Sequence, residues 1–229
     1  MRETICLEIA EREIVEYPRK MGVFALPPRY GLVVNSPLAV TRIVPIENLR
    51  TRMTAAYRWG LVKDAFPLGA ALNENTHLFD GCMYYGARNA VFLMAALPIA
   101  ESEAAWEAGA AHVGNGKKIT RLETAEAVLF RRVCAQGQHS GTSWVMYPCG
   151  TGVKALIITQ GLPRGVHFLS LDEAVRENAL HRALMAYVPS EVTMLMRDDW
   201  GAQWQHARAW LADYFDETSI PWAEGLFPD

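Results

Sequence analysis

Three β-prone runs lie close together in the second half of the chain, and they limit its fold more than any other feature of the sequence. The runs are AVLFRRVCA (127–135), SWVMYP (143–148) and VKALIITQ (153–160). Turns that contain glycine separate them, with Cys149, Gly150, Thr151 and Gly152 between the second run and the third. Runs of strand length divided by such turns predict an antiparallel meander.

Further strands are predicted in the first half of the chain. The segment TICLEIA (4–10) alternates apolar and other residues with the period of two that is typical of a half-buried strand. Residues 30–34 and 39–44 are rich in β-formers, and Asn35, Ser36 and Pro37 between them indicate a turn. The apolar run AVFLMAALPI (90–99) has the length of a buried strand, although its periodicity alone also permits a helix.

Helices are predicted beside these strands. A helix is expected to start at Pro45, and the segment ESEAAWEAGAAHV (101–113) is expected to be helical up to the glycines that follow it. Two pairs with the spacing of a capping box predict further helix starts. These pairs are Thr120 with Glu123, before a short helix, and Ser170 with Glu173, before a helix through about Tyr187; a last helix is predicted near 199–215. Strands with segregated helices predict an α+β fold.

The 229 residues show no repeat and no linker, so we expect a single domain, 1–229, with a helical, acidic C-terminal part from about residue 170. Cys6, Cys82, Cys134 and Cys149 include no close pair of the kind that zinc sites use. We therefore expect no metal and no cofactor. The sequence shows neither a signal peptide nor a membrane span, and a cytoplasmic location without membrane contact is expected.

The net charge of −3 hides two basic segments. Residues 17–63 hold eight basic groups and one acidic group, and residues 117–171 hold seven and two. Within the second segment, the tract HVGNGKKITR (112–121) combines glycines with cations, which is typical of an anion site but also of a solvated turn. Several arginines on neighbouring elements could follow a nucleic-acid backbone. The candidates for phosphate contacts are Arg50, Arg52, Arg58, Lys117, Lys118, Arg121, Arg131 and Arg132.

Two other functions stay open at this stage. One is a small cytoplasmic enzyme that uses His139 with Ser140 or Cys149, although no complete catalytic motif is present and no catalytic residue is assigned. The other is a protein-interaction module whose acidic, tryptophan-rich C-terminal part binds a partner.

One family resemblance rests on short motifs in the first half of the chain. They are LVVNSPLAV (32–40), THLFDG (76–81) and LPIAES (97–102), followed by the helix-prone AAWEAGAA (104–111). Over roughly residues 31–111, this arrangement resembles the RAMP-type subunit that caps the crRNA 5′ handle in type IV CRISPR effector complexes. The resemblance implies a ferredoxin-like or RRM-like antiparallel sheet with additional helices, especially in the C-terminal quarter. It also implies a non-catalytic subunit of a bacterial CRISPR ribonucleoprotein that binds crRNA and contacts a backbone subunit.

Overall fold

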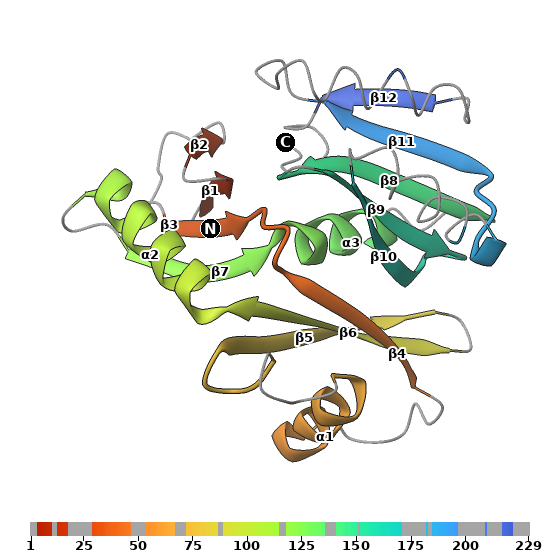
Figure 1. Cartoon of the computed structure of the whole chain (residues 1–229), viewed down its shortest axis with the longest axis horizontal. Helices are drawn as coiled ribbons and strands as arrows, with labels where there is room; N and C mark the ends of the chain where they lie inside the picture. Colours follow the sequence, from red (N-terminus) through yellow and green to blue (C-terminus); the bar gives the residue numbers. More distant parts are fainter. Residues whose placement is uncertain are drawn as a thin grey trace, which may run out of the picture.

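Three β-sheets and three helices make up the described part of the chain (Figure 1). The computed structural model describes residues 4–10, 13–17, 29–46, 54–66, 72–86, 89–114, 118–135, 141–150, 152–170, 182, 185–196, 209 and 217–221.

The first sheet has four strands in the order β2-β1-β3-β7. β1 pairs with β2 in antiparallel fashion, whereas β3 runs parallel to both β1 and β7. Helix α2 packs on this sheet through Ser102, Ala105, Gly109 and Val113, which share one face of the helix. A Cβ atom at Gly109 would lie 2.6 Å from a methyl group of Leu32, so the glycine permits the close approach of helix and sheet. The elements are β1 (Thr4–Ala10), β2 (Glu13–Tyr17), β3 (Arg29–Val34), α2 (Ile99–Val113) and β7 (Lys118–Thr124).

The second sheet has three antiparallel strands in the order β4-β6-β5. The central strand β6 is apolar along its length and mostly buried, and helix α1 covers the sheet with Val62 and with Phe66 at its C-cap. The predicted helix start at Pro45 is wrong, because Pro45 lies in β4 and pairs with Val91. β4 is an edge strand, where the missing N–H of a proline is tolerated. The elements are β4 (Val40–Ile46), α1 (Ala55–Ala65), β5 (His77–Tyr85) and β6 (Ala90–Pro98).

The third sheet has five strands in the order β10-β9-β8-β11-β12. β8, β9 and β10 form an antiparallel meander, and β11 runs parallel to both β8 and β12. Helix α3 packs against the sheet with Leu129 and Phe130, in a core that also holds Val33 of the first sheet and Leu93 of the second. The three sheets therefore share one apolar core. The elements are α3 (Ala125–Ala135), β8 (Thr142–Cys149), β9 (Gly152–Thr159), β10 (Leu162–Ser170), β11 (Glu191–Met196) and β12 (Glu217–Pro221).

The predicted antiparallel pairing of 143–148 with 153–160 is confirmed in β8 and β9, but the first predicted strand of the meander is wrong. Residues 125–135 form helix α3, and the third strand of the meander is β10. The predicted capping box of Thr120 and Glu123 is also wrong, since both residues lie in strand β7. The helix starts one residue beyond Thr124, whose Oγ1 accepts a hydrogen bond from the N–H of Ala127 at 3.4 Å.

The expected ferredoxin-like or RRM-like sheet is wrong, because three sheets with both parallel and antiparallel pairs replace it. The C-terminal quarter contributes the strands β11 and β12. The helix predicted from Ser170 to Tyr187 falls mostly outside the described residues, as does the one predicted near 199–215. The single domain stays a prediction. No helix among the described residues is long and apolar enough to cross a membrane.

Candidate functional site

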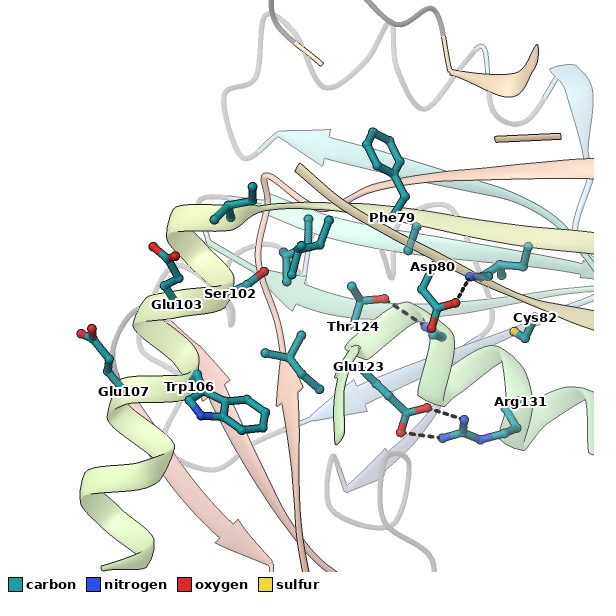
Figure 2. A pocket seen from close by; sticks show the side chains of 18 residues that line it. Phe79, Asp80, Cys82, Ser102, Glu103, Trp106, Glu107, Glu123, Thr124 and Arg131 are labelled. Atoms are coloured by element: carbon teal, nitrogen blue, oxygen red, sulfur yellow. Dashed lines mark hydrogen bonds and ion pairs between the residues drawn. The ribbon is translucent and has the colours of Figure 1, made fainter. Parts of the chain in front are cut away.

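An open cleft of about 790 Å³ lies where the four-stranded and three-stranded sheets meet (Figure 2). Five elements line it, so residues far apart in the sequence come together there. The lining consists of 78–82 from β5, Leu93, Ala95 and Leu97 from β6, Ile99, Ser102, Glu103, Trp106 and Glu107 from α2, 122–124 from β7, and Ala127 and Arg131 from α3.

Two edge strands border the cleft. β5 is an edge of the three-stranded sheet, and β7 is an edge of the four-stranded sheet. Five consecutive residues of β5 (78–82) and three of β7 (122–124) line the cleft. The cleft lies over one face of the three-stranded sheet, because every second residue of β6 lines it and pairs across with a lining residue of β5. It also reaches the edge of the sheet, since the intervening residues Phe79 and Gly81 of β5 line it as well. A strand edge offers backbone N–H and C=O groups to an added strand.

The cleft combines a buried apolar floor with exposed apolar side chains at its mouth. Leu93 and Leu97 of the floor are almost fully buried. Trp106 on α2 is 44% exposed, and Leu78 on β5 is 52% exposed. Trp106 and Leu78 thus offer apolar surface that a bound ligand would remove from water.

The rim of the cleft is acidic. Glu103 and Glu107 lie one helical turn apart on the exposed face of α2, beside Trp106 (Figure 2). Asp80 on β5 accepts a hydrogen bond from Arg58 at 3.1 Å, and its side chain is 92% exposed. Arg58 also donates to the backbone oxygen of Gly81 at 2.6 Å, so this arginine connects α1 to the rim.

An ion pair forms the wall of the cleft toward α3. Arg131 donates to the two carboxylate oxygens of Glu123 at 2.5 and 3.2 Å, and Arg121 Nε lies 3.2 Å from the same carboxylate. Burial alone would raise the pKa of Glu123, but the hydrogen bonds and charge of Arg131, together with the charge of Arg121, hold this pKa below its usual value. The hydrogen bond to Glu123 raises the pKa of Arg131. Both groups are therefore charged at neutral pH.

The depressed pKa of Glu123 predicts a pH-dependent contribution to stability. The unfolded chain binds the proton more tightly, so the contribution is complete above the ordinary pKa of about 4.3 and is lost as the pH falls through the native pKa. Glu123→Gln should therefore destabilise the protein more at pH 7 than at pH 3. Urea unfolding of both proteins at the two pH values measures this. An equal loss at both pH values would contradict it.

The predicted phosphate-binding residues divide into three groups. Arg58, Arg121 and Arg131 meet around the cleft, and each forms an ion pair with a carboxylate. Lys118 is exposed in β7, and Arg132 is half-buried in α3. Arg50, Arg52 and Lys117 lie outside the described residues. The structure does not test their role in binding phosphate, which stays a prediction.

The residues of the predicted enzyme site are only partly described. Cys149 is buried at the end of β8, and His139 and Ser140 lie outside the described residues. Among the other thiols, burial raises the pKa of Cys82, and burial together with the charge of Cys82 raises the pKa of Cys134 to about 12. A raised pKa makes both thiols poor nucleophiles at neutral pH.

The sequence analysis missed the acidic face of α2. Glu103, Trp106 and Glu107 have the i, i+3, i+4 spacing of one helix face, which the segment ESEAAWEAGAA already contained. A tryptophan between two glutamates on an exposed helix face indicates a binding surface, and this pattern could have been found in the sequence.

Comparisons with known proteins give a fold but no family. No family model matches the chain, and no curated protein matches it. One similar solved structure is the PilM-PilN type IV pilus biogenesis complex, in which the matched chain has a TM-score of 0.61 at 12% identity, over 98% of this chain and 90% of that one. Another is a Bacteroides thetaiotaomicron protein with an actin-like ATPase fold and unknown function, with a TM-score of 0.53 at 6% identity over 96% and 91% of the two chains.

The chain has an actin-like ATPase fold. A third similar structure is the cytoplasmic domain of EpsL, an inner membrane component of the type II secretion system of Vibrio cholerae, with a TM-score of 0.46 at 10% identity over 93% and 96% of the two chains. The resemblance to a RAMP-type CRISPR subunit is wrong, and the crRNA-binding function that it implied is wrong with it, because the whole chain follows another fold. The motif THLFDG, for example, continues from a turn into strand β5 and does not begin a helix.

Proposed function

We propose that this chain is a protein-interaction subunit that binds an extended segment of a partner protein in the cleft between β5, α2 and β7. The observation that carries this proposal is the edge of β5, of which five consecutive residues border the cleft. The N–H of Gly81 donates to Asp80 and its oxygen accepts from Arg58, so a segment pairs with this edge on either side of Gly81. There it gains main-chain hydrogen bonds whatever its sequence. Side-chain contacts then supply the specificity.

The apolar part of the cleft gives the bound segment its anchors. Trp106 and Leu78 expose large apolar surfaces, and the buried Leu93 and Leu97 line the same cleft. Aromatic residues in partly enclosed positions are the usual hot spots of protein interfaces. An extended segment with apolar side chains at alternate positions fits this surface.

The charge of the rim determines the chemistry of the partner. Glu103, Glu107 and Asp80 place carboxylates around the opening, and the nearest described cations, Arg58 and Arg131, are paired with Asp80 and Glu123. Charge complementarity favours lysine or arginine in the bound segment. We therefore expect a partner segment of roughly five residues that combines apolar and basic side chains.

The similar structures support a role in a protein complex. One of the similar structures is a complex of PilM with PilN, and a chain of that complex matches 98% of this chain. A subunit of a larger assembly needs an exposed binding surface, and the cleft supplies one.

Selection of peptides from a random display library tests the proposal. The immobilised protein should enrich segments in which apolar residues alternate and lysine or arginine is frequent. Trp106→Ala should weaken binding of a selected peptide by at least about tenfold, because truncation of an aromatic hot spot costs about 2 kcal/mol or more. Titration calorimetry with the purified peptide gives the affinities.

The matched control is Met185→Ala, which removes a side chain that is 76% exposed and does not line the cleft. This variant should bind the peptide as the wild type does. Equal losses from Trp106→Ala and Met185→Ala would contradict binding in the cleft. Selection of acidic peptides would contradict the proposed partner chemistry.

A further inference from the structure

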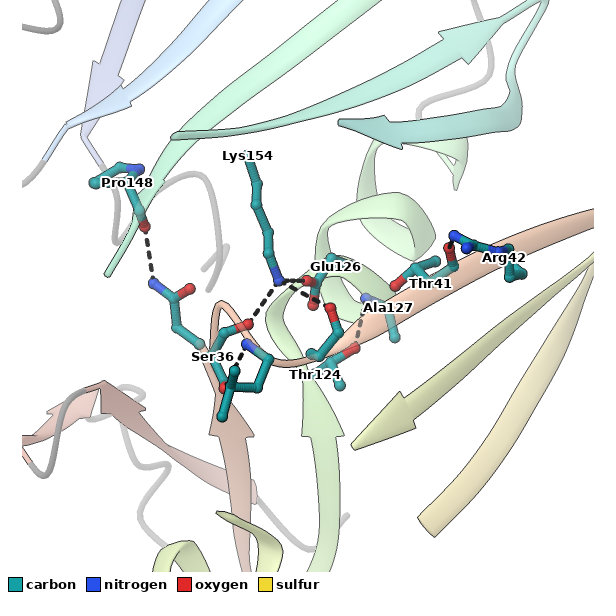
Figure 3. A network of polar contacts seen from close by, with 11 residues as sticks. Ser36, Thr41, Arg42, Thr124, Glu126, Ala127, Pro148 and Lys154 are labelled. Atoms are coloured by element: carbon teal, nitrogen blue, oxygen red, sulfur yellow. Dashed lines mark hydrogen bonds and ion pairs between the residues drawn. The ribbon is translucent and has the colours of Figure 1, made fainter. Parts of the chain in front are cut away.

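The name actin-like ATPase fold implies that proteins with this fold bind a nucleoside triphosphate with Mg²⁺. The residues of this chain either fit such a ligand or do not. Phosphate sites are built from helix N-termini, turns that contain glycine, and nearby cations. These three parts meet at one place in the described chain, where the three sheets adjoin (Figure 3). The helix is α3, the turn joins β8 to β9, and the cation is Lys154 of β9.

The ammonium group of Lys154 is fully engaged inside the protein. Its Nζ donates to the backbone oxygens of Ser36 at 2.7 Å and Ala39 at 3.4 Å, and it forms an ion pair with Glu126. An ammonium has three protons to donate, so these three acceptors match its capacity. Lys154 is only 2% exposed, so as long as Glu126 is present its ammonium group has no free proton to donate to a phosphate.

Glu126 supplies the negative charge at this place. It lies in the first turn of α3, where an anion is stabilised by the helix dipole, and it is fully buried. One carboxylate oxygen binds Lys154, and the other is buried without a hydrogen-bond partner. The carboxylate thus lies where a phosphate oxygen would be held by a helix N-terminus and a lysine.

The glycines of the β8–β9 turn have a structural explanation. Gly150 has φ of 56°, in the left-handed region that tight turns require. A Cβ atom at Gly152 would lie 2.4 Å from the ring of Phe168 and 2.6 Å from the backbone oxygen of Leu169. Close packing of β10 therefore requires Gly152, whether or not a ligand is present.

A magnesium ion also lacks suitable ligands here. Mg²⁺ prefers carboxylate oxygens, but the carboxylate of Glu126 is paired with Lys154, and the turn and its flanks read YPCGTGV (147–153), with no acidic residue. Asn35 donates to the backbone oxygen of Pro148 at 3.0 Å and joins the start of the turn to the segment that follows β3. The described residues include no group of three His, Cys, Asp or Glu side chains that could hold a metal ion. The residues present do not fit magnesium and a triphosphate.

We infer that Glu126 and Lys154 fill the phosphate position of this junction from within the protein, and that the chain holds its sheets together there by an internal ion pair instead of a bound nucleotide. Through these contacts, Lys154 connects β9 to α3 and to the segment 35–39. This inference concerns a different place from the cleft and does not depend on the proposed function.

Calorimetric titration of the wild-type protein with ATP and Mg²⁺ tests the inference without any substitution. We expect no saturable binding up to about 1 mM nucleotide. Saturable binding that is lost in the double variant Glu126→Leu/Lys154→Met would overturn the inference, since the junction would then hold the nucleotide.

A second measurement uses Glu126→Ala and inorganic phosphate. Removal of the carboxylate leaves Lys154 and the start of α3 without their anion, so phosphate should bind and stabilise this variant. At phosphate concentrations about ten times Kd, the melting temperature of Glu126→Ala should rise by about 3–6 °C, and that of the wild type should not change relative to chloride at equal ionic strength. A folded Glu126→Ala protein that does not respond to phosphate would overturn the assignment of Glu126 to the phosphate position.

Discussion

Replacement of Lys154 by methionine is expected to lower the free energy of unfolding by about 3–5 kcal/mol, because it leaves the carboxylate of Glu126 buried without a counter-charge. Both side chains of the ion pair are at most 3% exposed, so water cannot replace the missing partner. The backbone oxygens of Ser36 and Ala39 lose a donor as well. Urea unfolding at pH 7, followed by circular dichroism, measures the loss.

The double variant Glu126→Leu/Lys154→Met separates the ion pair from the surrounding packing. With both charges removed, the protein should recover at least about 2 kcal/mol relative to Lys154→Met, since apolar residues often replace a buried ion pair at little cost. It should stay less stable than the wild type, because the backbone oxygens of Ser36 and Ala39 both lose the ammonium of Lys154, and the oxygen of Ser36 keeps only the N–H of Ala39. A double variant as unstable as the sum of both single variants would contradict a direct interaction between the two side chains.

The sequence predicts strands and helices well where the pattern is local. The turn at Asn35, Ser36 and Pro37 separates β3 from β4 as expected, and β6 and α2 lie where the apolar run and the alanine-rich segment predict them. These segments have a strong pattern of their own, and their neighbours in the fold do not oppose it.

Helix α3 shows where local pattern fails. Val128, Phe130 and Val133 favour a strand by composition, yet the segment is helical. Its apolar side chains fill the core that the three sheets share, and Thr124 caps its start. Tertiary packing outweighs the small differences in intrinsic preference between these residues.

The arrangement of the sheets was beyond the sequence analysis for a different reason. β11 pairs with β8 in parallel, and β1, β3 and β7 form parallel pairs between distant segments. A parallel pair needs a long connection, so turn signals between adjacent runs do not reveal it. The turn signals predict only antiparallel neighbours, as in the meander, and the family resemblance implied an antiparallel sheet as well.

The charge pattern of the sequence was also only partly informative about the site. Arg58, Arg121 and Arg131 do approach one cleft, but each finds a carboxylate there. Arg131 and Glu123 are separated by a strand-to-helix boundary that the sequence analysis misplaced, so their pairing could not be foreseen. Lys154 was not among the predicted site residues, although a lysine inside the apolar strand VKALII needs a buried partner.

The three-stranded sheet supports the edge of β5, and its core residue Phe92 is expected to be essential for its stability. Phe92 is 1% exposed and lies in the apolar cluster between the sheet and α1, where Arg58 also lies 5.7 Å from its ring. Phe92→Ala should lower the free energy of unfolding by about 3–5 kcal/mol, through lost burial and the cavity that remains. Thermal and urea unfolding measure the change.

Phe168→Ala is the matched control, because it removes the same side chain from a strand position that is 40% exposed. Its cost should be about 1 kcal/mol or less, since much of the ring already contacts water. Peptide affinity should separate the two variants further: Phe92→Ala disturbs the strand next to β5 and should weaken binding in the cleft, whereas Phe168→Ala should leave it unchanged. Equal losses of stability in the two variants would contradict a special role of Phe92 in stabilising the sheet to which β5 belongs.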